Sequence, residues 1–383
     1  MTKFLAIFLT LYTAMHAVFY MRVRALLPER RSFHVLFLLL LLLMIVAPII
    51  SRLLERNGYE SAAKYLAVIA FNWTGFIFLA FCGALLMLII DGFFQALNYF
   101  GSANLPLLTG KFPALFLVGI VLSLCFYGYR EARAIKIERI RIETSKLPVG
   151  TDRLKIIQIS DVHIGLLTQR AVLKRIADAV AAENPDFIVS TGDFVDGMNG
   201  HLSELSNLFE RIEARFGKFA VTGNHEFYTG LARASEFTSK FGFTLLRGEA
   251  RTIDSVLNVV GVDDPAVSDA RNEAALLSSV QNGLFTLLLK HRPWVSDNSL
   301  GRFDLQLSGH THGGQIYPFN YLVSLQYPLP VGMVALPKES FLYTNRGSGT
   351  WGPQIRLLSP PEVTAIELVR KTLIERKQNG ESY

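Results

Sequence analysis

The chain has 383 residues, enough for more than one domain, and half of them are hydrophobic. Its formal net charge is +6, but residues 1–141 hold 14 Lys and Arg against 6 Asp and Glu, whereas the remainder holds 24 against 26. Because the basic excess flanks hydrophobic segments, it indicates a membrane protein and excludes a basic nucleic-acid-binding surface.

Four segments contain no Lys, Arg, Asp or Glu and are long enough, or nearly so, to cross a membrane as helices. We predict an all-α membrane domain of four transmembrane helices over residues 1–130. A signal peptide is an alternative for the first segment, but no small-residue cleavage site follows it and Arg22 ends it. The four segments are 4–21, 33–50, 65–90 and 112–129.

The distribution of Lys and Arg predicts the orientation. Four helices place the N-terminus, the 51–64 loop and everything after residue 129 on one side of the membrane. That side carries nine flanking Lys and Arg, and the other side carries five. Because cytoplasmic loops are richer in Lys and Arg, we expect a multi-pass protein of the cell membrane with a cytoplasmic C-terminal domain. The lipid bilayer is its predicted partner, and no protein partner is inferred.

After residue 130 the sequence changes to short apolar runs that end in polar loops. Residues 134–143 alternate apolar and charged side chains, as a half-exposed strand does, and 169–185 predict an amphipathic helix that Pro185 ends. Because ligands of open α/β sheets gather at the carboxyl ends of strands, we expect the polar loops to converge. Buried strands are predicted at 154–160, 186–193, 218–226, 257–264, 285–293 and 303–312.

Carboxylate, amide and imidazole side chains follow these strands. Singly, each could be a helix cap, a surface histidine or a histidine satisfied in the core, but their joint placement favours a metal site. A set of oxygen and imidazole donors without thiolates suits two divalent cations better than a structural zinc. In chain order the set is Asp161, His163, Asp193, Asp196, Asn224, His225, His291, His310 and His312.

Five blocks in this order resemble the motifs of the calcineurin-like metallophosphoesterases. The blocks are DVH at 161–163, GDFVD at 192–196, GNHE at 223–226, His291 and GHTH at 309–312. GNHEFYTG, SGHTHGGQIYP, NRG and PPEV are also similar to a bacterial membrane-associated branch of phosphodiesterases and UDP-2,3-diacylglucosamine diphosphatases. The resemblance implies an α/β fold, a four-layer α/β/β/α sandwich, which we place at residues 131–383 after the membrane domain.

The resemblance also implies the role of each residue. Water or hydroxide between two metals would attack phosphorus, His225 would protonate the leaving oxygen, and Asp196 would orient His225. Two divalent ions are expected, with manganese favoured over iron or zinc. One ion would be held by Asp161, His163, Asp193 and His312, and the other by Asp193, Asn224, His291 and His310.

The predicted activity is hydrolysis of a phosphodiester or pyrophosphate bond, and its sharpest version is a lipid-linked substrate such as a lipid A precursor. One alternative is a general phosphodiesterase or phosphomonoesterase for soluble esters. Another is a membrane sensor or transporter that binds metal or nucleotide without turnover. The intact His225 and Asp196 argue against that second alternative.

Two further features bear on the substrate. Gly197 stands where protein phosphatases of the family have an arginine that grips phosphate, which argues against a phosphoprotein substrate. Arg292, Arg346 and Arg356 are candidates to replace that arginine. The apolar stretch 317–337 is either a lip for a lipid-linked ester or a loop packed on its own domain, and we favour the packed loop.

Overall fold

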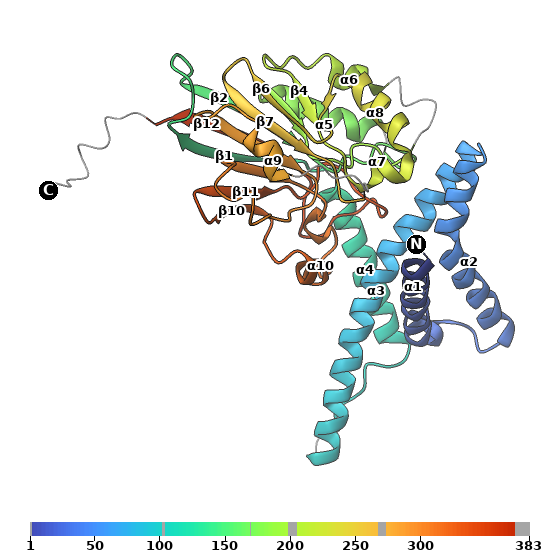
Figure 1. Cartoon of the computed structure of the whole chain (residues 1–383). Coiled ribbons are helices and arrows are strands. Elements are labelled where there is room, and N and C mark those ends of the chain that lie inside the picture. The colour runs from blue at the N-terminus through green and yellow to red at the C-terminus, as the bar shows by residue number, and fades with distance from the viewer. Residues whose placement is uncertain (1, 102–103, 169, 198–204, 267–272, 372–383) are drawn as a thin grey trace. The chain divides into compact units, whose positions relative to one another are not determined.

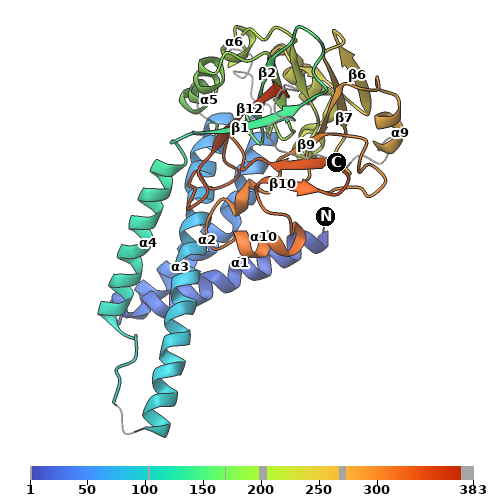
Figure 2. The same cartoon turned by 90° about the vertical axis from the view of Figure 1, so that its left-hand side faces the viewer.

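The computed structural model describes residues 2–101, 104–168, 170–197, 205–266 and 273–371. The chain divides into two compact units, which Figures 1 and 2 show in two views. The first unit comprises residues 1–130 together with 352–355, and the second comprises 131–351 together with 356–383. The first unit consists mainly of long helices. Among the described residues, the strands belong to the second unit.

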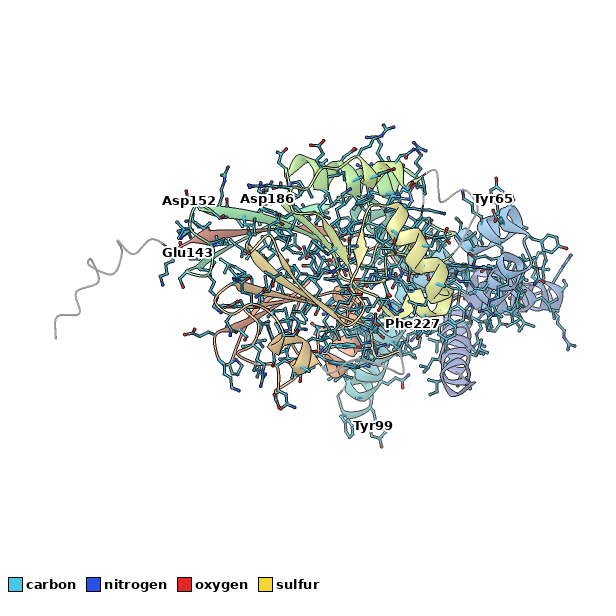
Figure 3. The ribbon with its side chains drawn as sticks, turned by 45° about the horizontal axis from the view of Figure 1, so that its top comes forward. Tyr65, Tyr99, Glu143, Asp152, Asp186 and Phe227 are labelled. Carbon is cyan, nitrogen blue, oxygen red and sulfur yellow. The ribbon has the colours of Figure 1, made fainter. Side chains whose placement is uncertain are left out.

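Four long helices make up the first unit. Each is long and apolar enough to cross a membrane, which confirms the prediction of four such segments. The helices continue past the charge-free segments, and α3 has 41 residues, about 60 Å at 1.5 Å per residue. Figure 3 labels Tyr65 and Tyr99, near the two ends of α3. The elements are α1 (Thr2–Val23), the 3-10 turn η1 (Arg24–Leu26), α2 (Arg31–Arg56), α3 (Glu60–Phe100) and α4 (Lys111–Glu131).

Small residues fill the contacts between these helices, and large apolar side chains point outward. Leu36, Ile89 and Phe116 are 66, 70 and 65% exposed. Lipid is as apolar as these side chains, so close packing of small residues is what brings membrane helices together. The pattern is therefore that of a helix bundle in lipid. Fully buried alanines include Ala47, Ala63, Ala67, Ala70, Ala80 and Ala84.

An arginine and an aspartate with largely buried side chains form an ion pair in this unit. Arg22 Nη1 donates to Asp91 Oδ2 over 2.9 Å and to the carbonyl of Leu108 over 3.0 Å. The Leu108 N–H in turn donates to Asp91 Oδ1 over 2.6 Å. Pairing of this kind reduces the cost of ionised groups within or beside a bilayer. The interaction ties α1 and α3 to the segment that precedes α4.

Two six-stranded mixed sheets form the second unit. The first has the order β1-β12-β2-β3-β4-β5, and the second β10-β11-β9-β8-β7-β6. The first sheet contains β1 (Lys136–Thr144), β2 (Arg153–Ile159), β3 (Phe187–Ser190), β4 (Lys218–Ala220), β5 (Thr244–Leu245) and β12 (Glu362–Arg370). The second contains β6 (Glu249–Ile253), β7 (Leu257–Val262), β8 (Phe285–Lys290), β9 (Leu305–Ser308), β10 (Gly332–Leu336) and β11 (Ser340–Thr344).

The alternation of side chains along the strands produces the layers. Ile156 of β2 packs between the two sheets with Leu257 and Leu287 of the second sheet. Its neighbour Ile157 faces the other way, into a core with helices α5 (Arg170–Ala182), α6 (Asn207–Glu210) and α8 (Leu231–Lys240). On the outer face of the second sheet, Leu288 packs near α9 (Glu273–Ser278). This order of layers confirms the predicted α/β/β/α sandwich.

The predicted strands agree with the structure except at some ends. The segment 218–226 forms a strand only as far as Ala220, and Asn224 begins the short helix α7 (Asn224–Thr229). Gly223 lies at the N-cap of this helix, three residues after the strand ends. The apolar stretch after residue 316 contains the helix α10 (Asn320–Gln326), which follows the 3-10 turn η3 (His312–Gly314).

Candidate metal centre

The predicted ligands follow the carboxyl ends of neighbouring strands from both sheets. Asp161 and His163 come after β2, Asp193 after β3, and Asn224 after β4 in the first sheet. In the second sheet, His291 follows β8, and His310 and His312 follow β9. The sandwich brings these loops together, although 151 positions separate the first residue from the last.

The backbone at five of these residues is in the left-handed region. The φ angles are 50° at Asp161, 51° at His163, 49° at Asp193, 71° at His310 and 51° at His312. This region costs a residue with a side chain about 1–2 kcal/mol. Such backbone persists where the surrounding fold imposes it, commonly at functional sites.

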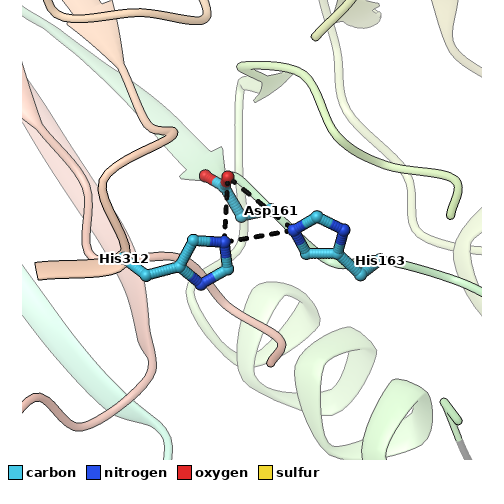
Figure 4. Close-up of side chains that lie close together, drawn as sticks. All are labelled: Asp161, His163 and His312. Carbon is cyan, nitrogen blue, oxygen red and sulfur yellow. Dashed lines mark hydrogen bonds and ion pairs between the residues drawn. The ribbon is translucent and has the colours of Figure 1, made fainter. Parts of the chain in front are cut away.

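Asp161, His163 and His312 form the first cluster (Figure 4). Nε2 of His312 lies 3.1 Å from Nε2 of His163 and 3.3 Å from Oδ1 of Asp161. Two atoms that each lie about 2.1 Å from one ion are roughly 3.0–3.4 Å apart at octahedral or tetrahedral angles. The spacing therefore fits a shared cation.

Asp193, His291 and His310 form the second cluster. Nε2 of His291 lies 3.2 Å from Oδ2 of Asp193 and 3.1 Å from Nδ1 of His310. The other ring nitrogen of His291 donates to the carbonyl of Thr191 over 2.8 Å, which orients Nε2 toward the cluster. These distances also fit ligands of one cation.

Asp193 lies between the two clusters. Its Oδ2 atom, 3.2 Å from His291 in the second cluster, is 3.9 Å from Nε2 of His163 in the first. Asn224 adds a neutral oxygen: within the described part of the chain, its buried Oδ1 has no hydrogen-bond partner. A buried acceptor without a partner is costly, and a cation would supply what it lacks. The donors present therefore fit two divalent ions.

Carboxylates near the second cluster favour positive charge on its histidine His291. Burial disfavours charge on His291, but the carboxylates of Asp193 and Asp161 outweigh it and raise the pKa of His291 to about 10. By contrast, burial and the charge of His225 lower the pKa of His163 to about 3. The second cluster thus attracts positive charge, and His163 keeps the neutral imidazole that a metal ligand needs.

His225 lies beside the clusters and is held by Asp196. Nδ1 of His225 is 2.5 Å from Oδ1 of Asp196, and Nε2 is 3.9 Å from Oδ2 of Asp193. Burial opposes protonation, but Asp193 and Asp196 outweigh it and raise the pKa of His225 to about 9. The two acids therefore favour the protonated imidazole, and its Nε2 lies on the side of the candidate metal centre.

Glycines let the loops approach this closely. A Cβ atom on Gly309 would lie 1.9 Å from Oγ of Ser160 and 2.2 Å from Oδ2 of Asp161. The backbone N–H of His310 donates to the same Asp161 carboxylate over 3.0 Å. A side chain at position 309 would displace Asp161, so the first glycine of SGHTHGGQ allows β9 to meet the loop after β2.

Sequence reasoning missed Glu226, which organises the loops. Its buried carboxylate accepts hydrogen bonds from the backbone N–H groups of Asp193, Val195 and Gly223 over 3.1, 3.0 and 2.7 Å. Burial and the charge of Asp193 raise the pKa of Glu226 to about 7. Its position three residues after Gly223, at the start of α7, is the signal that could have revealed it, because an acid at the third helical position commonly caps a helix.

The three candidate arginines have other partners. Arg356 is fully buried and donates to backbone carbonyls, including those of Gly349 and Ser359. Arg292 pairs with Asp264 over 2.7 Å. Arg346 pairs with both Glu138 and Glu362. Arg356 is therefore not accessible for binding phosphate, and Arg292 and Arg346 already form ion pairs with carboxylates.

The comparison with known proteins agrees with this geometry. The sequence profile of the calcineurin-like phosphoesterases matches residues 154–314. An uncharacterized metallophosphoesterase of Aquifex aeolicus is 36% identical over 66% of this chain and 98% of its own length. A transmembrane protein with metallophosphoesterase domain from Danio rerio is 28% identical over 78% of this chain and 74% of its own. A UDP-2,3-diacylglucosamine pyrophosphatase of Chlamydia muridarum is 28% identical over 63% of this chain and 92% of its own length.

Proposed function

Because this chain belongs to the calcineurin-like phosphoesterase family and is thus a metal-dependent phosphoesterase, we propose that it cleaves a phosphodiester or pyrophosphate bond at a dinuclear centre. The placement of Asp193 carries the proposal, since one carboxylate oxygen faces ligands of both clusters. Two divalent cations held there would activate water and stabilise the charge that develops on the phosphate. Manganese is the ion we propose, with iron and zinc as alternatives.

The protein side chains have separate tasks in this proposal. The metals would be held by Asp161, His163, Asp193, Asn224, His291, His310 and His312, and because Asn224 is neutral the site would keep positive charge to attract an anionic ester. His225 gives its Nε2 proton to the leaving oxygen, and Asp196 holds the ring so that Nε2 faces the centre. General acid catalysis of this kind contributes about 10²–10⁴-fold to rate.

We propose that residues 1–130 anchor the catalytic domain, residues 131–383, on the cytoplasmic side of the membrane. The four helices and the transmembrane relative support a membrane protein. An even number of crossings places the N-terminus and the catalytic domain on one side, and nine flanking Lys and Arg against five favour the cytoplasm. Alkaline phosphatase fused after residue 383 should be inactive. An active fusion would show that the catalytic domain lies on the opposite side of the membrane from the one we propose.

An apolar surface on the catalytic unit supports a lipid-linked substrate. Its members, which we name the α10 surface, are Tyr317, Phe319, Tyr321, Leu322 and Leu325. They are 40, 44, 59, 58 and 82% exposed, and no residue of α10 is buried. Our expectation that the stretch 317–337 packs on its own domain therefore does not hold for these five side chains, whereas Tyr327 directly after α10 is buried.

The α10 surface is attached directly to the candidate metal centre. A Cβ atom on Gly314 would lie 2.4 Å from the backbone of Asn320, so the first turn of α10 rests on the glycine two residues after His312. Aromatic side chains such as these tyrosines are enriched where a protein meets the membrane–water interface. Together with the Chlamydia relative, this supports an ester that carries acyl chains.

An assay on detergent-purified protein tests the proposed activity. We would compare an aryl phosphodiester, an aryl phosphomonoester and UDP-2,3-diacylglucosamine, with Mn²⁺ present or removed by a chelator. Metal-dependent cleavage that Asp193→Ala abolishes would support the enzyme, and the preferred ester would identify its class. Absence of turnover of all three esters by metal-loaded protein would contradict the proposal.

A further inference from the structure

Two exposed aromatic residues border His225. The ring of Tyr228 lies 5.5 Å from the imidazole and the indole of Trp351 lies 5.7 Å from it, both nearly perpendicular to it. Tyr228 belongs to α7, whereas Trp351 comes from a loop 126 positions further along the chain than His225. The fold thus places two rings from distant segments beside one imidazole.

Gln315 fixes the position of Trp351. Its Oε1 atom accepts the N–H of Trp351, and its Nε2 atom donates to the carbonyl of Trp351, each over 2.9 Å. Gln315 is itself buried and follows the glycine pair after His312. The same loop that carries a predicted metal ligand therefore positions Trp351, whose backbone has both polar groups satisfied by one side chain.

Both rings remain exposed in this position. Trp351 is 49% exposed and Tyr228 is 70% exposed, although such side chains usually bury most of their surface. Exposed aromatic rings provide a stacking surface for another ring, and the fixed backbone of Trp351 lowers the entropic cost of using it. We propose that Tyr228 and Trp351 form an aromatic subsite that binds a planar ring on the leaving group of the substrate.

The position of His225 assigns the subsite to the leaving group. This step rests on the proposed function, in which Nε2 of His225 protonates the leaving oxygen. Whatever is bonded to that oxygen must lie beside the imidazole, and there it meets Tyr228 and Trp351. An ester whose leaving group carries a flat ring gains contacts that a small acyclic alcohol cannot make.

Kinetics with 4-nitrophenyl methyl phosphate test the subsite, because the one ring of this diester is on its leaving oxygen. In Trp351→Ala and in Tyr228→Ala, KM should rise roughly three- to tenfold while kcat stays within about twofold. Trp351→Phe, which keeps a ring, should recover most of the loss. Inhibition by inorganic phosphate, which has no ring, should not change.

Tyr65→Ala, at a 74% exposed tyrosine of α3, is the matched control and should behave as wild type. An unchanged KM in both alanine variants, or a loss confined to kcat, would overturn the subsite, since the rings would then only position His225. Calorimetry with phenylphosphonate and methylphosphonate on Mn²⁺-loaded protein separates the two proposals. Preference for the phenyl ligand that both variants lose would support the subsite even if the enzyme hydrolysed no ester.

Discussion

Asp196 accepts a hydrogen bond from Nδ1 of His225 over 2.5 Å, and this contact fixes which imidazole nitrogen faces the candidate metal centre. Nε2 then lies 3.9 Å from Oδ2 of Asp193. A carboxylate that holds a histidine in one tautomer also favours its protonated form. The pair therefore has the geometry of a positioned proton donor.

Asp196→Asn should lower kcat by about 10–100-fold, because the amide no longer stabilises the protonated imidazole. The loss should be larger for a phenyl phosphodiester than for its 4-nitrophenyl analogue, since phenolate is the more basic leaving group and depends more on a proton. Steady-state kinetics on the two esters measure this ratio. Equal losses, with metal content unchanged, would contradict the role of His225.

Single substitutions of the histidine pair should remove different metals. His312 lies in the cluster with Asp161, and His310 lies in the cluster with His291. His312→Ala and His310→Ala should therefore each retain about one of two ions, whereas Asp193→Ala should weaken both. Plasma mass spectrometry of Mn²⁺-loaded protein gives the stoichiometry. Loss of both ions from either histidine variant would contradict separate sites.

Glu226→Gln should destabilise the catalytic unit by roughly 1–3 kcal/mol. The new amide NH₂ group would face backbone N–H groups that now donate hydrogen bonds to the carboxylate. Thermal unfolding of the metal-free protein measures the change. Glu236→Gln is the matched control, since this helical side chain is exposed and pairs with Lys240; its effect should be much smaller, because an exposed ion pair contributes little to stability. Equal effects would mean that Glu226 has no organising role.

Replacing Tyr321 and Leu325 by serine should lower kcat/KM for UDP-2,3-diacylglucosamine in mixed micelles about tenfold or more, because both side chains would lose contact with lipid. Hydrolysis of 4-nitrophenyl methyl phosphate should stay within about twofold. Val149→Ser, at another highly exposed apolar residue, should change neither rate. Equal losses on both substrates would show that α10 is not a lipid contact.

Patterns local in sequence predicted much of the fold. The apolar run that becomes β2 ends at Ile159, and Asp161 follows it in the predicted place. The same holds for β3 with Asp193 and for β8 with His291. Period and strand length depend on neighbouring residues alone, so such elements can be recognised without knowing what packs on them.

Contacts between distant segments escaped prediction. The bond between Gln315 and Trp351 joins residues 36 positions apart, and Arg356 is buried because a whole loop wraps around its guanidinium. The exposure of α10 depends on what the rest of the fold leaves uncovered, which apolar composition does not reveal. Each depends on tertiary packing, where a residue's own type says little.

The division of ligands between the sheets gives the metals a second consequence. Each cluster combines residues that follow strands of the first sheet with histidines that follow β8 or β9 of the second. An ion bound there would cross-link the two halves of the sandwich, and its binding energy would add to their cohesion. Metal supply would then set the lifetime of the folded domain as well as its turnover, so a cell starved of the ion would lose the protein along with its activity.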